Sequence, residues 1–254
     1  MRSEALDPYS DIAGLYESEH TAFTDDIDFY RGLISEGQDS VLEAGCGTGR
    51  IAIQLSQMGC KVTGIDISTA MLTVAQDEAN RVGVEMQFDC GDMRRMSYDK
   101  TFDLAIVALD SFSHFLEDSD QACALQCLYK CLVTGGKLAI DVFNPNPYVL
   151  IDRDGRLMLQ SEFCDKNALL TSHFVAWEMN PNGRSIYTRH YYDTIKENGN
   201  VRRISTNFEL RCSTRMEIEG LMRIVGFRDI EVYGDYDKSP YSDDSERMVF
   251  VAAK

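Results

Sequence analysis

Residues 41–50 read VLEAGCGTGR, and this stretch decides the expected fold. It begins as a short, mostly apolar strand and continues into a turn with glycines at 45, 47 and 49; a helical pattern follows from Arg50. Glycines let the backbone of such a turn approach a ligand closely, and the N-terminus of the following helix offers free N–H groups. The stretch therefore predicts a strand–turn–helix unit that binds a ligand.

Short apolar runs and amphipathic helical patterns alternate downstream of this unit. We expect strands at 40–44, 61–66, 84–89, 102–108 and 137–143, with helices at 50–58, 69–80 and 120–132 between them. A further helix at 214–225 and strands at 229–234 and 248–252 close the chain. This alternation predicts an α/β fold, a Rossmann-like seven-stranded sheet with helices on both faces.

Two segments interrupt that alternation. The first 36 residues are expected to form a helical lid, with Thr24 capping one of its helices. Long strand-like runs at 169–180, 184–195 and 201–212 are joined by turns that each contain Asn-Gly, a strong hairpin signal. The sequence thus predicts a lid at 1–36, a core at 37–150, an inserted antiparallel β meander at 151–213 and a closing part at 214–254.

The charge and the cysteines limit the classes of partner and compartment. A formal net charge of -16 opposes binding to nucleic acid or to an anionic membrane. The polar N-terminus resembles no secretory signal, and no apolar run is long enough to span a bilayer, so we expect a cytoplasmic protein with reduced thiols. The spacing of Cys123, Cys127 and Cys131 suits one helix, and we expect no metal site there.

The glycine spacing separates two classes of cofactor. Dinucleotide enzymes carry G-x-G-x-x-G and place a pyrophosphate at the helix N-terminus. Here the pattern is G-x-G-x-G, with Glu43 two residues before the first glycine. A carboxylate there would repel a pyrophosphate and suits a ligand with an ammonium or sulfonium group, although Glu43 could instead be a buried carboxylate that organises the turn.

The segment EAGCGTG at 43–49 resembles motif I of the class I S-adenosylmethionine-dependent methyltransferases. The resemblance continues in register with GIDIS at 64–68, GDM at 91–93, FDLAIVA at 102–108 and LVTGGKL at 132–138. It implies that Asp66 holds the ribose hydroxyls and that Asp92 contacts the adenine amino group; alone, either residue could be a helix cap or a loop residue. The expected cofactor-binding residues are Glu43, Gly45, Cys46, Gly47, Gly49, Asp66, Ile67, Met71, Asp92, Met93, Ala108 and Tyr16.

The order of lid, core and β insertion resembles a small-molecule subgroup that includes deoxysugar N,N-dimethyltransferases. The segment LDSFSHFL at 109–116 resembles the loop after strand four in those enzymes, which makes His114 a candidate base; a purely structural histidine is the alternative. Candidate substrate contacts are Tyr9, Arg189, Tyr191 and Tyr192. NPNPY at 144–148 matches the N-P-P-Y motif of nucleic-acid amino-methyltransferases neither in sequence nor in position.

The expected activity is methyl transfer from S-adenosylmethionine to a nitrogen or oxygen of a small molecule, by a monomer or homodimer. Three alternatives remain open at this point. They are a protein or RNA methyltransferase, a non-catalytic S-adenosylmethionine-binding module, and a nicotinamide oxidoreductase.

Overall fold

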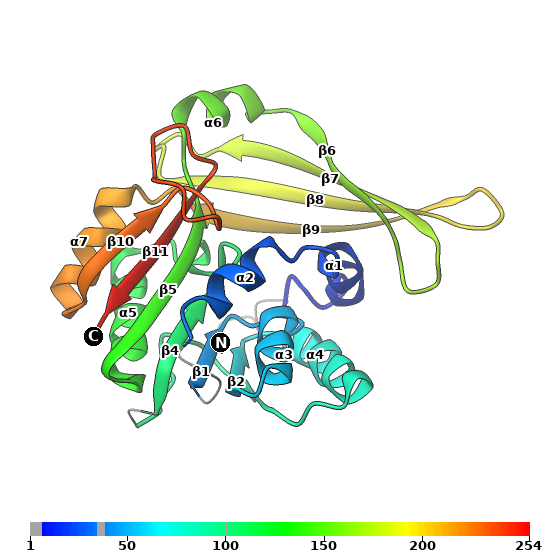
Figure 1. Cartoon of the computed structure of the whole chain (residues 1–254). Coiled ribbons are helices and arrows are strands. Elements are labelled where there is room, and N and C mark those ends of the chain that lie inside the picture. The colour runs from blue at the N-terminus through cyan, green and yellow to red at the C-terminus, as the bar shows by residue number, and fades with distance from the viewer. Residues whose placement is uncertain (1–6, 35–38, 100) are drawn as a thin grey trace, which may run out of the picture.

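The computed structural model describes residues 7–34, 39–99 and 101–254, and a seven-stranded sheet forms its centre (Figure 1). The strand order is β3-β2-β1-β4-β5-β11-β10, in which β11 runs antiparallel to both of its neighbours and the first five strands are parallel. The strands are β1 (Ser40–Ala44), β2 (Lys61–Asp66), β3 (Gln87–Cys90), β4 (Phe102–Val107), β5 (Leu132–Phe143), β10 (Arg228–Tyr233) and β11 (Arg247–Ala253). The α/β fold and its seven-stranded sheet are therefore confirmed.

The strand expected at 84–89 begins later because the preceding helix runs on to Val82. Gly83 ends that helix in the left-handed conformation, and Val84 N–H still bonds back to the Ala79 carbonyl. Pairing with β2 therefore starts only at Gln87. The predicted start of this strand was too early, because an apolar residue directly after a helix fits both a helix end and a strand start.

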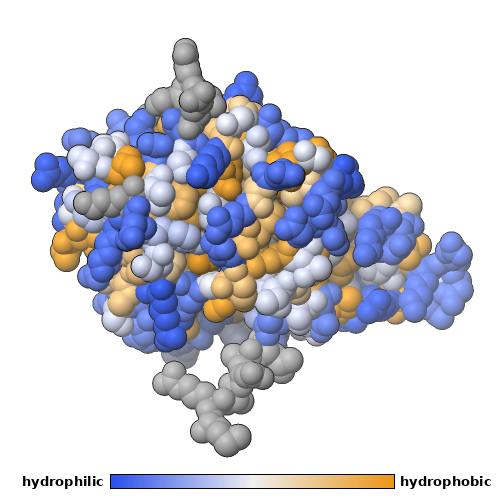
Figure 2. Space-filling view, turned by 90° about the horizontal axis from the view of Figure 1, so that it is seen from below, coloured by the Kyte–Doolittle hydropathy of each residue, from blue (hydrophilic) through white to orange (hydrophobic). Residues whose placement is uncertain are grey.

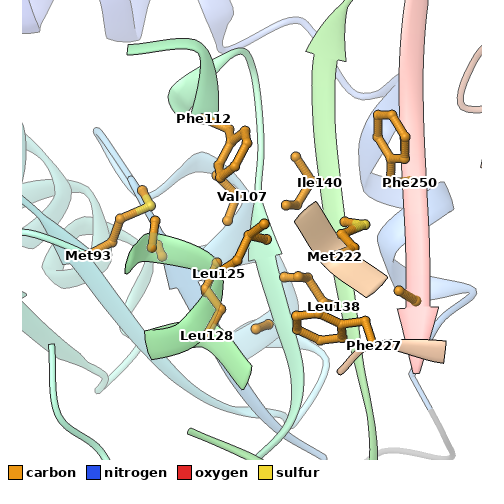
Figure 3. Packing of buried hydrophobic residues seen from close by; sticks show 14 of the residues in the cluster. Met93, Val107, Phe112, Leu125, Leu128, Leu138, Ile140, Met222, Phe227 and Phe250 are labelled. Carbon is orange, nitrogen blue, oxygen red and sulfur yellow. The ribbon is translucent and has the colours of Figure 1, made fainter. Parts of the chain in front are cut away.

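Helices cover both faces of the sheet and position its loops. One face carries α5 (Asp118–Cys131) and α7 (Arg215–Val225), and the other carries α2 (Asp25–Arg31) and α3 (Arg50–Gln57) (Figure 1). The remaining helices are α1 (Ala13–His20), α4 (Thr69–Val82), the short 3₁₀ helix η1 (Ser111–His114) and α6 (Pro147–Arg153). Figure 3 shows Leu125 and Leu128 of α5 packing with Val107 and Ile140 of the sheet. Because burial of apolar surface drives this packing, the sheet and α5 form a firm base for the loops above them.

The insertion is a separate antiparallel sheet of four strands rather than the three expected. Its strands are β6 (Leu157–Cys164), β7 (Leu170–Met179), β8 (Ser185–Ile195) and β9 (Val201–Arg211), paired in that order. The additional strand, β6, lies at an edge and is largely exposed, so its sequence lacks a clear inward-facing alternation. The turns that join β6 to β7 and β8 to β9 project beyond the core (Figure 1), and Figure 2 shows mostly hydrophilic residues at the end of this projection.

The N-terminal segment is helical, and Thr24 occupies the expected N-cap position of α2. Its side chain makes no capping hydrogen bond; instead Asp26, in the first turn of α2, forms a bidentate ion pair with Arg50. That contact fastens α2 to α3 at the end of the glycine turn. Residues 1–6, 35 and 36 of the expected lid lie outside the described residues.

The NPNPY run at 144–148 has a structural role. Asn144 and Asn146, from the NPNPY run, donate their side-chain amides to backbone carbonyls at Asp243 and Ser245, and they hold the loop before β11.

The three cysteines at 123, 127 and 131 lie on α5, and all eight cysteines of the chain lie within the described residues and are free. In the part of the chain that the structure describes, no helix is long and apolar enough to cross a membrane.

Candidate functional site

A cavity of about 270 Å³ opens beyond the carboxyl ends of the parallel strands, where the strand order reverses between β1 and β4. Open α/β sheets bind their ligands at such a switch point. Ten residues predicted to bind cofactor or substrate, or to act as the base, line this cavity: Tyr9, Tyr16, Gly45, Gly47, Asp66, Ile67, Met71, Asp92, Met93 and His114. A smaller cavity shares several of these walls and adds the predicted residues Glu43, Cys46 and Ala108.

The glycine turn shapes the floor of the cavity. Gly45, Gly47 and Gly49 all have positive φ, a conformation that side chains other than glycine disfavour. A Cβ at Gly47 would project into open space, whereas one at Gly49 would press on Ala75, Ile53 and Phe88. Gly47 therefore leaves room for a ligand, and Gly49, which lines neither cavity, serves the packing of α3.

Asp66 lies at the end of β2 with its carboxylate fixed by the backbone. Its two oxygens accept hydrogen bonds from Gly47 N–H and Ser68 N–H, both at 2.8 Å. Burial raises the pKa of Asp66, an effect that these two bonds only partly offset. Each carboxylate oxygen has a further lone pair, so the group can still accept from a ligand in the cavity.

Asp92 is engaged by Arg94, a residue that sequence reasoning missed. The guanidinium donates to both oxygens of Asp92, at 2.6–3.0 Å, and reaches Asp120 at 2.7 Å. Burial acts to raise the pKa of Asp92, but the hydrogen bonds from Arg94 outweigh it and lower the pKa. Arg94 also lies 5.4 Å from the ring centroid of Phe115, and both residues line the cavity beside Asp92.

Glu43 lies beneath the glycine turn rather than in the main cavity. It is buried, its carboxylate accepts from Ala52 N–H at 2.7 Å, and burial raises its pKa to about 8. These contacts match the alternative interpretation of Glu43 as a carboxylate that organises the turn. It also lines the smaller cavity, so contact with a cationic group there stays a prediction.

His114 and Tyr9 meet in the wall of the cavity. The Tyr9 hydroxyl lies 3.1 Å from Nε2 of His114. Burial raises the pKa of Tyr9 well above its usual range. The His114 ring remains accessible from the cavity, yet the protein around it displaces enough water to lower its pKa to about 4. Tyr9 is therefore protonated and His114 neutral at physiological pH. In the His114 tautomer that carries its proton on Nδ1, the Tyr9 hydroxyl donates to Nε2.

Three predicted substrate contacts, all on β8, lie elsewhere. Arg189 is exposed and pairs with Glu178, while Tyr191 lies under the guanidinium of Arg203. Tyr192 points inward but packs on Ile12 and Phe208 and donates to Glu19. No described residue of β6–β9 lines the cavity. The prediction that these three residues line the cavity was therefore wrong. Alternate residues of a strand face opposite sides, so Arg189 and Tyr191 lie on the more exposed face of β8, and the lid lies between the other face and the core.

The inserted sheet acts on the cavity through the N-terminal segment. Thr206 of β9 donates its hydroxyl to the Pro8 carbonyl at 2.6 Å, and Tyr9 packs on Phe208 with ring centroids 4.8 Å apart. On the core side, Ser68 donates to the carboxylate of Asp7 at 2.6 Å. Residues 7–9 are thus held between the inserted sheet and the N-terminus of α4, where Pro8 and Tyr9 form part of the cavity wall.

Comparison with known proteins agrees with this arrangement. Residues 41–136 match the methyltransferase domain family. The chain is 27% identical over 216 residues to a curated methyltransferase-type protein of Bacillus subtilis (strain 168), covering 84% of this chain and 83% of that one. It is 26% identical over 228 residues to the glycine/sarcosine N-methyltransferase of Aphanothece halophytica, covering 89% and 80%.

The fold is shared with solved structures. An S-adenosylmethionine-dependent methyltransferase from Clostridium acetobutylicum ATCC 824 superposes with a TM-score of 0.79 at 16% identity, covering 96% of this chain and 98% of that one. The chain is a class I S-adenosylmethionine-dependent methyltransferase. The residues of this methyltransferase fit its cofactor, because the Gly47 backbone leaves open space beside the fixed carboxylate of Asp66.

Proposed function

We propose that this methyltransferase transfers the methyl group of S-adenosylmethionine to a nitrogen or oxygen of a small-molecule metabolite. The observation that carries the proposal is the wall that Pro8, Tyr9 and Tyr16 add to the cavity, with the Tyr9 hydroxyl within hydrogen-bond distance of His114. A site walled in this way suits a small ligand, and a polymer would need an open groove. Its volume of about 270 Å³ lies just below the range of about 300–1,000 Å³ that is usual for small-ligand sites.

On the cofactor side, Asp66 would accept from the ribose hydroxyls and Asp92 from the adenine amino group. When bound, S-adenosylmethionine supplies a methyl group made electrophilic by its sulfonium. The chain's own task is to orient the acceptor in line with that methyl group and to exclude water. Asp66 suits its role because the Gly47 and Ser68 backbones hold it in place, so little ordering is needed on binding.

On the acceptor side, His114 and Tyr9 would contact the nucleophile. With a pKa of about 4, His114 is a weaker base than one matched to neutral pH. It stays an uncharged hydrogen-bond acceptor at physiological pH, which favours an acceptor that arrives as a neutral amine or a hydroxyl. A proton leaving that group can pass to Nε2 of His114, directly or by way of the Tyr9 hydroxyl.

Nitrogen is the favoured acceptor atom. Support comes from the glycine/sarcosine N-methyltransferase of Aphanothece halophytica and from the shared fold of a sugar N-methyltransferase from Streptoalloteichus sp ATCC 53650, which has a TM-score of 0.76 at 19% identity over 94% of this chain and 91% of that one. The net charge of -16 opposes a nucleic-acid or membrane partner. The free cysteines support a reducing compartment, and we place the enzyme in the cytoplasm as a monomer or homodimer.

The test combines binding and turnover. Calorimetry with S-adenosylhomocysteine should give micromolar affinity, about -8 kcal/mol, and no saturable binding of NADH. Methyl transfer is then measured by mass spectrometry with glycine, sarcosine and a panel of amino sugars, beside total RNA and a protein extract. Turnover on a small amine, lowered about a hundredfold in His114→Gln, supports the proposal. Methylation of RNA or protein alone would overturn it.

A further inference from the structure

The chain between β4 and η1 turns through two consecutive residues with positive φ, Leu109 at 46° and Asp110 at 64°. Neither is glycine, and a β-carbon makes this left-handed region unfavourable. Such strain persists only where surrounding contacts hold it, and it gathers at functional sites. Here it lies directly before Ser111–His114, the short helix that brings His114 to the cavity.

Asp141 of β5 binds both N–H groups of this turn. Its carboxylate accepts from Leu109 N–H at 3.1 Å, and its backbone carbonyl accepts from Asp110 N–H at 3.2 Å. The side chain is fully buried, and the Tyr236 hydroxyl and Arg247 Nε also donate to it, each at 2.5 Å. A buried carboxylate with this many donors has one stable orientation.

Asp110 and Arg247 close the network. The Asp110 carboxylate accepts from Phe143 N–H at 2.5 Å and from the Arg247 guanidinium at 3.4 Å. Arg247 therefore lies between two carboxylates and balances charge that would otherwise repel across the turn. Beyond the turn, the Ser111 hydroxyl reaches the Gly45 carbonyl at 3.4 Å, so η1 also abuts the glycine turn.

We propose that Asp141 and Arg247 are positioning residues, which hold the left-handed turn at Leu109–Asp110 so that η1 presents His114 to the cavity. The side chains of this network touch neither cavity; they act through the backbone of the turn. The value of holding His114 at the cavity rests on the proposed function, whereas the claim that Asp141 and Arg247 hold the turn does not. Asp141 lies on β5 and Arg247 on β11, so two strands outside the turn supply the residues that hold it.

The test reads the surroundings of His114 without any methyl acceptor. The chain has four histidines, so their titration can be followed by NMR of the labelled imidazoles from pH 8 to pH 5, with His114→Gln assigning one signal. In the wild type both His114 and His190, whose pKa values burial lowers to about 4 and about 3, stay neutral in this range. His190 lies on β8 and is the internal control.

Three substitutions at one position separate conformation from charge. Asp110→Ala disfavours positive φ, Asp110→Gly allows it without a carboxylate, and Asp110→Asn allows it and keeps an acceptor for Phe143 N–H. We expect His114 to titrate within the range, toward its ordinary pKa of about 6.5, in Asp110→Ala and in Asp141→Asn. It should stay neutral in the Gly and Asn variants, and His190 should stay neutral in all of them.

The proposal is overturned if His114 stays neutral in both folded Asp110→Ala and folded Asp141→Asn, or if Asp110→Gly behaves as Asp110→Ala does. Arg247→Met, which removes the charge but keeps much of the stem, replaces Asp141→Asn should that variant not fold. These outcomes do not depend on turnover. Should the enzyme methylate none of the small amines, the proposed function fails, while the titration still decides the role of the turn.

Discussion

Glu19 links the N-terminal helix α1 to the inserted sheet, and its removal should loosen the wall of the cavity. Its carboxylate accepts from Nδ1 of His173 at 2.7 Å, from the Ser161 hydroxyl at 2.5 Å and from the Tyr192 hydroxyl at 3.3 Å. The side chains of Glu19 and His173 are 8% and 6% exposed. Because α1 also carries Tyr16, which lines the cavity, this carboxylate connects the sheet to the site.

The magnitude follows from the donors that Glu19→Ala would strand. A buried donor left without an acceptor costs about 1–3 kcal/mol. The two hydroxyls can rotate toward other acceptors, so the imidazole N–H of His173 carries most of the penalty, together with the lost charge-assisted bond. We expect Glu19→Ala to lower the free energy of unfolding by about 3 kcal/mol, a fall in Tm of roughly 6–12 °C for a chain of this size.

The assay is urea unfolding at pH 7.5, followed by circular dichroism and by the fluorescence of Trp177, the single tryptophan, which lies on β7. Glu162→Ala is the matched control, because Glu162 accepts one hydroxyl, from Ser172, on an exposed part of the same sheet. That variant should lose less than about 0.5 kcal/mol. If Glu19→Ala were no less stable than Glu162→Ala, the link between lid and sheet would be refuted.

The pH dependence gives a second check on Glu19. Burial acts to raise the pKa of Glu19, but the hydrogen bonds from His173 and Ser161 outweigh it and lower the pKa below its usual value of 4.5. A carboxylate whose pKa is lower in the folded state stabilises the fold above its unfolded pKa and loses that effect as the pH falls. The stability difference between wild type and Glu19→Ala should therefore shrink below about pH 4.5.

Three further predictions concern the core. Asp66→Ala should weaken S-adenosylhomocysteine binding ten- to a hundredfold in calorimetry, about 1.4–2.8 kcal/mol, and unchanged affinity in a folded variant would exclude a ligand role for Asp66. Because burial raises the pKa of Glu43 to about 8, the wild type should lose stability as the pH rises from 4.5 to 8, and Glu43→Gln should abolish that slope in urea unfolding; parallel slopes would contradict this. Arg50→Met breaks the buried ion pair between Arg50 and Asp26, whose side chains are 10% and 0% exposed. In the same assay the free energy of unfolding should fall by about 3–5 kcal/mol, and a fall of less than about 1 kcal/mol would argue against a stabilising role of this pair.

The core and its ligand end could be predicted because their signals are local. The glycine run at 45–49 follows directly on a strand, and Asn-Gly pairs mark the hairpins of the insertion, so a few adjacent residues suffice to predict each element. The carboxyl ends of parallel strands meet at one edge, which is why Gly47, Asp66, Asp92 and His114 could be placed on one cavity from their positions after strands.

The side of a strand that a residue faces, and the contacts between distant segments, could not be predicted in this way. Arg189 and Tyr191 were predicted as substrate contacts because they lie in the insertion. One residue of register decides which side of a strand each occupies, and both lie on the more exposed face of β8. The left-handed turn at Leu109–Asp110 carries no glycine to signal it; donors and acceptors from β5 and β11 hold it in place. Local preference determines which elements form, whereas the pairing of distant segments determines which side chains meet, and only the tertiary structure contains that pairing.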